Sequence, residues 1–304
     1  MLRREFISKV GVGVFGFGFL AGCGESDRVP SGTPLRFGVM TDLHYADRDR
    51  AGSRYYRDSL SKAGEGIAVF NEQKVDFVIE TGDFKDQGRP SDEASTLTYL
   101  QTVEKVFQQF NGPTYHVLGN HDMDSISKQQ FLGNVENTGI AAGRNYYSFD
   151  VKGVHCVVLD ANFNSDGSDY DHGNFNWTDA NIPNAEIDWL KDDLAAAKGI
   201  VVVFLHQLLD GEGSVYVNNA VDVRKVLEDS GKVAAVFQGH HHAGSYNLIN
   251  GIHYYTLKAM IEGPYPENNV FAIVEVLGDR MIVTDNRATK SVYRFDQPKL
   301  TPQF

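Results

Sequence analysis

Seven side chains of the types that bind metal ions fall in five short segments of this 304-residue sequence. They are Asp42, His44, Asp83, Asn120, His206, His240 and His242. Each segment directly follows an apolar, strand-like run, and side chains that follow strands converge at the carboxyl edge of a sheet. Imidazole nitrogen combined with carboxylate and amide oxygen, without thiolate, favours Mn, Fe, Zn or Co and disfavours Ca. The residue types and their placement therefore predict a hydrolase that uses two metal ions.

The order of these segments resembles that of a known family. Asp-x-His, Gly-Asp, Gly-Asn-His-Asp, a single His after a strand and Gly-His-x-His follow one another as in the calcineurin-like metallophosphoesterases. The resemblance covers about residues 35–290. It implies that one ion is bound by Asp42, His44 and His242 and the other by Asn120, His206 and His240, with Asp83 bridging the two.

The same resemblance implies the reaction, which is hydrolysis of a phosphoric ester. A hydroxide shared by the two ions attacks phosphorus in line, and the paired cations stabilise the entering and leaving oxygens. His121 is then the general acid on the leaving oxygen, or stabilises the charge that develops there. Asp122 is expected to orient the imidazole of His121. His121 and Asp122 are therefore the predicted catalytic residues.

A narrower resemblance concerns the substrate. The segment Arg54–Leu60 and the tripeptide Ile261-Glu262-Gly263 are similar to those of manganese-dependent ADP-ribose/CDP-alcohol diphosphatases, although His44 stands where Gln is expected in that group. We therefore expect a phosphodiester or pyrophosphate bond in a small, nucleotide-like molecule. A phosphomonoesterase that uses the same metal ions is the enzymatic alternative. A third possibility is a lipoprotein that binds metal or phosphate without catalysing a reaction. Such a protein would be expected to lack at least one metal ligand, whereas all seven predicted ligands are present in this sequence.

Several polar residues around these motifs could contact the substrate. Arg54 and Arg57 could grip phosphate oxygens, because a guanidinium binds them in a bidentate manner, or they could belong to a solvated first helical turn. His172 and Asn174 are expected substrate contacts in an Asn-, Asp- and Gly-rich segment at 161–183. A loop of that length inside a compact domain is usually functional, and its aromatic residues indicate a lid over the site.

Lesser roles are expected for four other residues near the motifs. Lys85 could touch phosphate, and Glu262 could support a metal ligand from behind. Asp86 is expected to fix a loop, and His241 to point away from the metal ions.

The remaining pattern predicts the elements that hold these residues. Apolar runs that alternate with helical periodicity are typical of α/β proteins, and the family resemblance implies a four-layer α/β/β/α sandwich with two central mixed sheets flanked by helices. Helices are predicted at 54–71, at 91–110 with Ser91 as N-cap, at 185–197 and at 219–230. Strands are predicted at 35–41, 75–80, 115–118, 146–151, 154–159, 200–205, 233–237, 245–249, 253–257, 270–276 and 281–285.

The first 22 residues are expected to be an export signal. Arg3-Arg4 precedes an apolar run that is too short to span a bilayer, and Leu20-Ala21-Gly22-Cys23 follows it. These features resemble a twin-arginine signal joined to a bacterial lipoprotein box, which implies lipidation of Cys23 and a periplasmic or cell-surface location on a membrane. A plain cleaved signal and a retained anchor are the alternatives. Residues 23–34 are predicted to be a tether, and 35–298 a single domain.

Charge and cysteine content narrow the choice of partners. The formal net charge is −12, and it would be about −14 after removal of residues 1–22. Such a charge is unfavourable for binding a nucleic acid polymer, so the expected partner is a small phosphorylated substrate.

The only cysteine besides Cys23 is Cys156, so no disulfide is predicted. The sequence carries no indication of oligomeric state.

Overall fold

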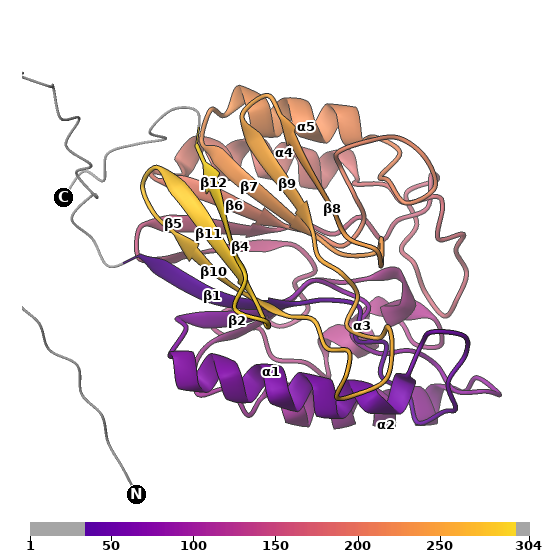
Figure 1. The fold of residues 1–304 in the computed structure, drawn as a ribbon. Coiled ribbons are helices and arrows are strands. Elements are labelled where there is room, and N and C mark those ends of the chain that lie inside the picture. Colours follow the sequence, from indigo (N-terminus) through magenta and orange to yellow (C-terminus); the bar gives the residue numbers. More distant parts are fainter. Residues whose placement is uncertain (1–33, 296–304) are drawn as a thin grey trace, which may run out of the picture.

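Two six-stranded sheets packed face to face form the centre of the molecule (Figure 1). In this computed structural model, residues 34–295 are described. The predicted signal, Cys23, most of the tether and residues 296–298 of the predicted domain lie outside the described residues, so their predicted roles are not tested here.

The first sheet has the order β12-β11-β10-β1-β2-β3. Its strands β1 (Leu35–Met40), β2 (Phe77–Glu80) and β3 (Thr114–His116) are parallel. The antiparallel strands β10 (Ala272–Val276), β11 (Arg280–Asp285) and β12 (Lys290–Arg294) extend it. The apolar faces of α1 (Ser59–Gln73), α2 (Glu93–Phe107) and α3 (Lys128–Leu132) pack on its outer side.

The second sheet has the order β4-β5-β6-β7-β9-β8. The four central strands are parallel: β5 (Val154–Val158), β6 (Ile200–Phe204), β7 (Val233–Gln238) and β9 (Ile252–Thr256). The edge strands β4 (Tyr147–Val151) and β8 (Ser245–Ile249) are antiparallel to their neighbours. The helices α4 (Asn184–Ala196) and α5 (Ala220–Asp229) cover its outer face.

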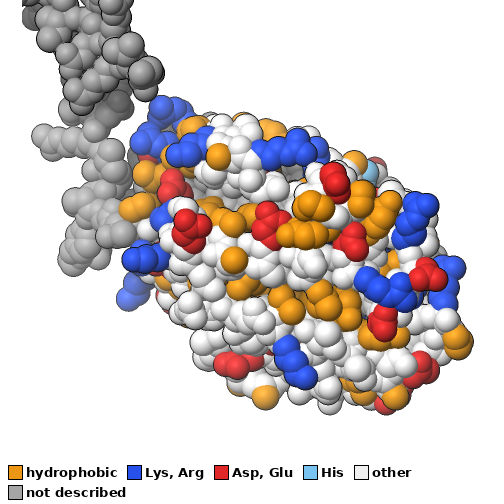
Figure 2. Space-filling model, turned by 60° about the horizontal axis from the view of Figure 1, so that its bottom comes forward, with side chains coloured by type: hydrophobic (Ala, Val, Ile, Leu, Met, Phe, Trp, Pro, Cys, Tyr) orange, Lys and Arg blue, Asp and Glu red, His pale blue; other side chains and the backbone are white. Residues whose placement is uncertain are grey.

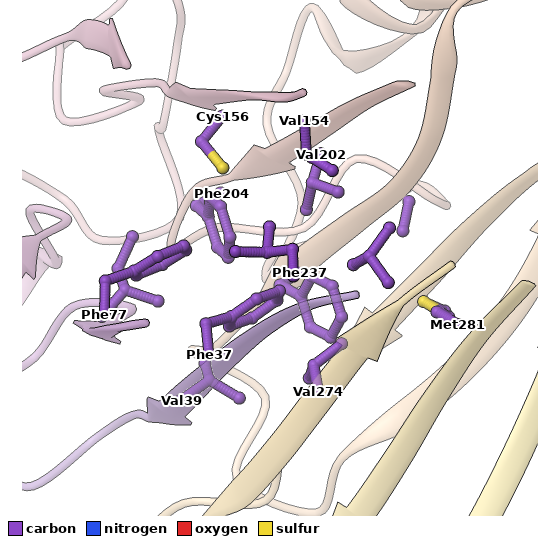
Figure 3. Close-up of a cluster of buried hydrophobic side chains, with 14 of the residues drawn as sticks. Phe37, Val39, Phe77, Val154, Cys156, Val202, Phe204, Phe237, Val274 and Met281 are labelled. Atoms are coloured by element: carbon purple, nitrogen blue, oxygen red, sulfur yellow. The ribbon is translucent and has the colours of Figure 1, made fainter. Parts of the chain in front are cut away.

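An aromatic core joins the two sheets (Figure 3). The ring of Phe37 on β1 stacks on Phe77 at 5.0 Å between centroids, and its edge meets Phe204 at 5.4 Å and Phe237 at 5.5 Å from the other sheet. Cys156 is buried in this core, which fits its expected role as a small apolar residue. The predicted four-layer α/β/β/α sandwich is confirmed.

Two predicted helix starts were wrong. Asp92, not Ser91, is the N-cap of α2, because its side chain accepts a hydrogen bond from the backbone N–H of Ser95 at 2.8 Å. The first helix begins at Ser59 rather than at residue 54, because the backbone of Arg54 pairs with Ala51 and Glu262 instead. The elements α3 and β12 were not predicted.

Charges of both signs are interspersed on the face that carries α1 and α2, without a continuous basic surface (Figure 2). Within residues 34–295, no helix combines the length and the apolar character needed to cross a bilayer.

Candidate metal centre

All seven predicted ligands lie at one end of the sandwich, in loops that follow strands. β1, β2 and β3 lead to Asp42 and His44, to Asp83 and to Asn120, whereas β6 and β7 of the other sheet lead to the three remaining histidines. The chain turns sharply in these loops, and Asp42, His44, Asp83 and His240 all have positive φ values of 46–64°. Such backbone is disfavoured for residues with a side chain and clusters at functional sites.

One group of ligand atoms comes from Asp42, His44 and His242, which lie within 4.8 Å of one another. Oδ1 of Asp42 is 3.7 Å from Nε2 of His44 and 3.4 Å from Nε2 of His242. The two imidazole nitrogens are 3.3 Å apart. This is the set that the family resemblance implies for one ion.

The other group contains Asp83, His206 and His240, again within 4.8 Å of one another. Oδ2 of Asp83 lies 3.1 Å from Nε2 of His206 and 3.4 Å from Nε2 of His44. Asp83 therefore stands between the two groups, in the position expected of a bridging carboxylate. A glycine at 82 is required here, because a Cβ at that position would lie 2.5 Å from Nδ1 of His206.

Four of these polar atoms are buried without a hydrogen-bond partner among the described residues: Oδ1 of Asp42, Oδ1 of Asn120, Nε2 of His206 and Nε2 of His240. A buried polar atom that lacks a partner destabilises a protein by about 1–3 kcal/mol, so such atoms seldom occur without a function. Nitrogen and oxygen atoms that face one another in this way fit divalent cations such as Mn, Fe, Zn or Co. The residues present thus suit two metal ions.

In three of the histidines, Nδ1 lies close to an oxygen atom outside the centre, so that Nε2 faces the centre. Nδ1 of His206 lies 2.8 Å from the carbonyl oxygen of Thr81, Nδ1 of His242 lies 2.6 Å from Oε1 of Glu262, and Nδ1 of His44 lies 3.3 Å from Oδ2 of Asp86. Such partners fix the ring orientation of metal-binding histidines. Glu262 and Asp86 therefore stand where the sequence led us to expect supporting residues. His241 is exposed.

The electrostatic environment suits ligands in their metal-binding forms. Burial alone would raise the pKa of Asp42, but the nearby imidazoles of His242 and His44 outweigh it and hold that pKa below its usual range. Burial and the neighbouring His206 lower the pKa of His240 to about 3, which keeps its imidazole neutral.

The expectation that Asp122 orients His121 was wrong. Nδ1 of His121 lies 2.7 Å from Oδ2 of Asp124, three residues along the chain. The carboxylate of Asp122 instead accepts four backbone hydrogen bonds, from the N–H groups of Gly119, Asp83, Phe84 and Lys85. The residues 120–123 form a 3-10 turn, and this turn directs the two carboxylates to different partners.

His121 itself lies next to the metal-type residues. Its ring centroid is 4.7 Å from that of His44, and its backbone N–H donates to Oδ1 of Asp83 at 2.8 Å. Burial would lower the pKa of His121, but the carboxylates of Asp83, Asp124 and Asp86 outweigh it and raise the pKa to about 10. Lys85 does not face this space, because its amine donates to the backbone oxygen of His121 and its side chain is buried.

The two arginines predicted to bind substrate have different surroundings. Arg54 lines a cavity of about 290 Å³ that also contains His121 and Asp124. Arg57 is exposed and forms ion pairs with Asp47 at 2.5 Å and Asp49 at 2.7 Å. The structure therefore does not bring Arg57 to the centre, because two exposed carboxylates already engage its guanidinium.

The segment 161–183 approaches the metal-type residues through Trp177, which was not among the predicted substrate contacts. The indole of Trp177 lies 5.7 Å from the imidazole of His240, and this tryptophan is half exposed. His172 is instead directed toward the start of α2, where Nε2 is 3.3 Å from Oε2 of Glu93. Asn174 bonds within its own loop, where its Oδ1 accepts from the backbone N–H of Asp171. His172 and Asn174 thus do not approach the metal-type residues.

Three residues that line the cavity beside His121 were overlooked at the level of the sequence: Asp124, Arg48 and Arg89. Trp177 belongs to the aromatic residues from which a lid at 161–183 was predicted, but it was not singled out as a contact. The spacing of three residues between His121 and Asp124 was the available signal, because residues three apart lie on one side of a helical turn.

Several known proteins are similar to this chain in sequence or in fold. The calcineurin-like phosphoesterase family matches residues 35–244. The manganese-dependent ADP-ribose/CDP-alcohol diphosphatase of Oryza sativa subsp. japonica is 28% identical and aligns with 81% of this chain and 89% of its own length. A protein of the same name from Arabidopsis thaliana is 26% identical, over 81% of this chain and 92% of its own. A crystal structure of a dimetal phosphatase from Danio rerio shares the fold, with a TM-score of 0.75 at 21% identity over 86% of this chain and 100% of that one.

Proposed function

This chain belongs to the calcineurin-like phosphoesterase family, and from that premise we propose that it hydrolyses a pyrophosphate or phosphodiester bond in a small nucleotide-like molecule. The observation that carries the proposal is the set of buried, unpartnered nitrogen and oxygen atoms at the end of the sandwich where both sheets contribute ligand loops. The names of the relatives from Oryza sativa and Arabidopsis thaliana support a diphosphate substrate and manganese as one suitable metal.

In the proposed reaction, Asp42, His44 and His242 would hold one cation and Asn120, His206 and His240 the other, with the carboxylate of Asp83 placed between the two groups. When bound, the two cations stabilise charge on the reacting phosphate and activate water.

The other residues act on the substrate or on one another. His121 donates a proton from Nε2 to the leaving oxygen, and Asp124 holds the opposite ring nitrogen at 2.7 Å. Arg54, whose guanidinium has no ion-pair partner within residues 34–295, binds phosphate oxygens.

The proposal is tested by assaying the purified protein on four substrates: ADP-ribose, CDP-choline, bis-p-nitrophenyl phosphate and p-nitrophenyl phosphate. Mn, Zn, Fe or Co would be added back after chelation. We expect diphosphate or diester hydrolysis that chelation abolishes, that a metal restores and that His121→Ala reduces. A preference for p-nitrophenyl phosphate would establish the phosphomonoesterase alternative. Full activity in the chelated protein would refute the two-metal mechanism. If no substrate is hydrolysed with any of the metals, the protein is better explained as a non-catalytic metal- or phosphate-binding protein.

The segment 161–183 is further proposed to cover bound substrate through Trp177, as its position near His240 suggests. We expect Trp177→Ala to raise the KM for ADP-ribose, whereas Trp189→Phe, at a partly buried tryptophan packed on Tyr146, should leave KM unchanged.

From the sequence alone, we also propose that the protein is exported and anchored through lipid on Cys23, in the periplasm or on the cell surface. Metabolic labelling with radioactive palmitate tests this directly. We expect label in the protein from producing cells and none in Cys23→Ala, and an unlabelled wild-type protein would exclude the anchor.

A further inference from the structure

The cavity beside His121 has more basic than acidic side chains in its wall, although the chain as a whole is acidic. Its volume is about 290 Å³, and three arginines line it, Arg48, Arg54 and Arg89. Asp86 and Asp124 also line it, so arginines outnumber carboxylates by three to two there, whereas the whole sequence has 28 basic and 40 acidic residues. An excess of cationic groups around a cavity favours an anionic ligand.

The two carboxylates of the cavity have partners other than Arg54 and Arg89. Asp124 is engaged by His121 at 2.7 Å. Asp86 accepts the backbone N–H of Gln87 at 2.7 Å, and its other oxygen lies 3.3 Å from Nδ1 of His44. Only Arg48 approaches it, at 3.4 Å. Within residues 34–295, neither Arg54 nor Arg89 forms an ion pair. Burial would raise the pKa of the nearby Glu262, but the charge of Arg54 is among the effects that lower it, so Arg89 in particular is available to an anionic ligand.

Arg48 is held in place before any ligand arrives. One of its guanidinium nitrogens donates to the backbone oxygen of Gln87 at 2.9 Å, and its guanidinium carbon lies 3.7 Å above the ring of the buried Tyr56. A guanidinium that is already ordered loses less side-chain entropy when it binds phosphate.

The location of the cavity identifies which part of the substrate it receives. His121 lies in a group with His44 and Asp83, and it also forms part of the cavity wall. Because His121 donates its proton to the leaving oxygen in the proposed reaction, the cavity lies on the side of the leaving group.

We propose that this cavity binds a second phosphate, carried by the leaving group, and that Arg89 and Arg48 contact it. This inference rests on the proposed function and makes it more specific. In the reaction, a water oxygen bonds to the phosphorus at the metal ions and the bond from that phosphorus to the bridging oxygen breaks. The bridging oxygen departs on the second phosphate and takes the proton of His121, while the attacking water releases a proton to solvent.

The predicted substrates are therefore diphosphates that release a phosphate monoester, and they are preferred over diesters with an uncharged leaving group. The organic part of the leaving group has space beyond the second phosphate, because a neighbouring cavity of about 530 Å³ shares Arg48 and Arg89 as wall residues. Tyr99 also lines that cavity, together with the carboxylates of Asp47, Asp49 and Asp92.

Arg89→Gln tests the inference, with ADP-ribose and bis-p-nitrophenyl phosphate as the two substrates. Arg144→Gln is the matched control, since Arg144 is also exposed and without an ion pair among the described residues but lies outside both cavities. Because a guanidinium contact to a charged phosphate is a strong hydrogen bond, we expect Arg89→Gln to raise the KM for ADP-ribose by about tenfold. It should change kcat/KM for bis-p-nitrophenyl phosphate by less than about twofold, because the nitrophenolate leaving group carries no phosphate.

A binding measurement separates affinity from turnover. Calorimetry with the non-hydrolysable α,β-methylene ADP should give a comparable loss of affinity in Arg89→Gln and none in Arg144→Gln. If wild type cleaves ADP-ribose but Arg89→Gln alters both substrates equally, or matches Arg144→Gln, the inference is wrong and the proposed function stands. If wild type cleaves only the nitrophenyl substrates, the proposed diphosphatase function fails and the inference with it.

Discussion

Oδ2 of Asp124 lies 2.7 Å from Nδ1 of His121, so this carboxylate fixes the ring of the predicted general acid. Asp124→Asn replaces that acceptor with an amide that can hold the ring in the wrong orientation or tautomer. We expect kcat for ADP-ribose to fall by about ten- to hundredfold with little change in KM. An unchanged kcat in steady-state kinetics would mean that another group orients His121.

Asp122 has a structural role, so its substitution should act on stability. Its buried carboxylate accepts four backbone N–H groups from the two ligand loops, including those of Gly119 and Asp83. In Asp122→Asn, an NH₂ group would face these donors, and we expect the free energy of unfolding of the metal-free protein to fall by about 2–4 kcal/mol. Urea denaturation measures this change. Asp166→Asn, in an exposed loop, should shift the midpoint very little.

Glu262 should set metal affinity through His242, since its Oε1 lies 2.6 Å from Nδ1 of that imidazole. We expect Glu262→Gln to weaken Mn binding by about ten- to hundredfold, because a carboxylate partner orients the ring and raises its basicity. Trp177 near His240 offers a fluorescence signal for the titration. The control is Glu267→Gln, at an exposed position of the same segment, and equal affinities in the two variants would contradict the assignment.

Most of the fold and the ligand set could be predicted because their signals are local. Buried strands such as β6 and β7 are uninterrupted apolar runs, and the polar residues that follow them mark the edge of the sheet. The helix α3 has only five residues and β12 is mostly exposed, so neither carries a clear apolar period.

The partners of single charged side chains could not be predicted in the same way. Both Asp122 and Asp124 are close to His121 in the sequence, and only the geometry of the turn assigns one to the ring and the other to backbone amides. The ion pairs of Arg57 with Asp47 and Asp49 likewise depend on how the preceding loop folds back.

His116 should make stability fall at alkaline pH. Its Nδ1 lies 3.0 Å from Glu80 and its Nε2 lies 3.1 Å from Glu104. Burial would lower the pKa of His116, but these two carboxylates outweigh it and raise the pKa to about 10. The folded protein therefore retains a proton that the unfolded chain loses near its ordinary pKa of 6.5.

This raised pKa stabilises the fold fully below the unfolded value of 6.5, and the contribution is lost as pH rises toward about 10. The expected slope is at most about 1.4 kcal/mol of unfolding free energy per pH unit between these values. Urea unfolding of the metal-free protein at several pH values measures it, and His116→Gln should lack this component. A wild type and a variant with parallel pH profiles would show that His116 is neutral in the fold.

The seven metal-type side chains are divided between the two sheets, and this division has a consequence for biosynthesis. Asp42, His44, Asp83 and Asn120 follow strands of the first sheet, whereas His206, His240 and His242 follow strands of the second. The first sheet is completed only by β10–β12, the last strands of the chain. A nascent chain that has emerged only to the end of α4 carries four of the ligands and lacks its imidazole-rich half. A complete centre therefore requires that both sheets have formed and docked, because each supplies part of the ligand set.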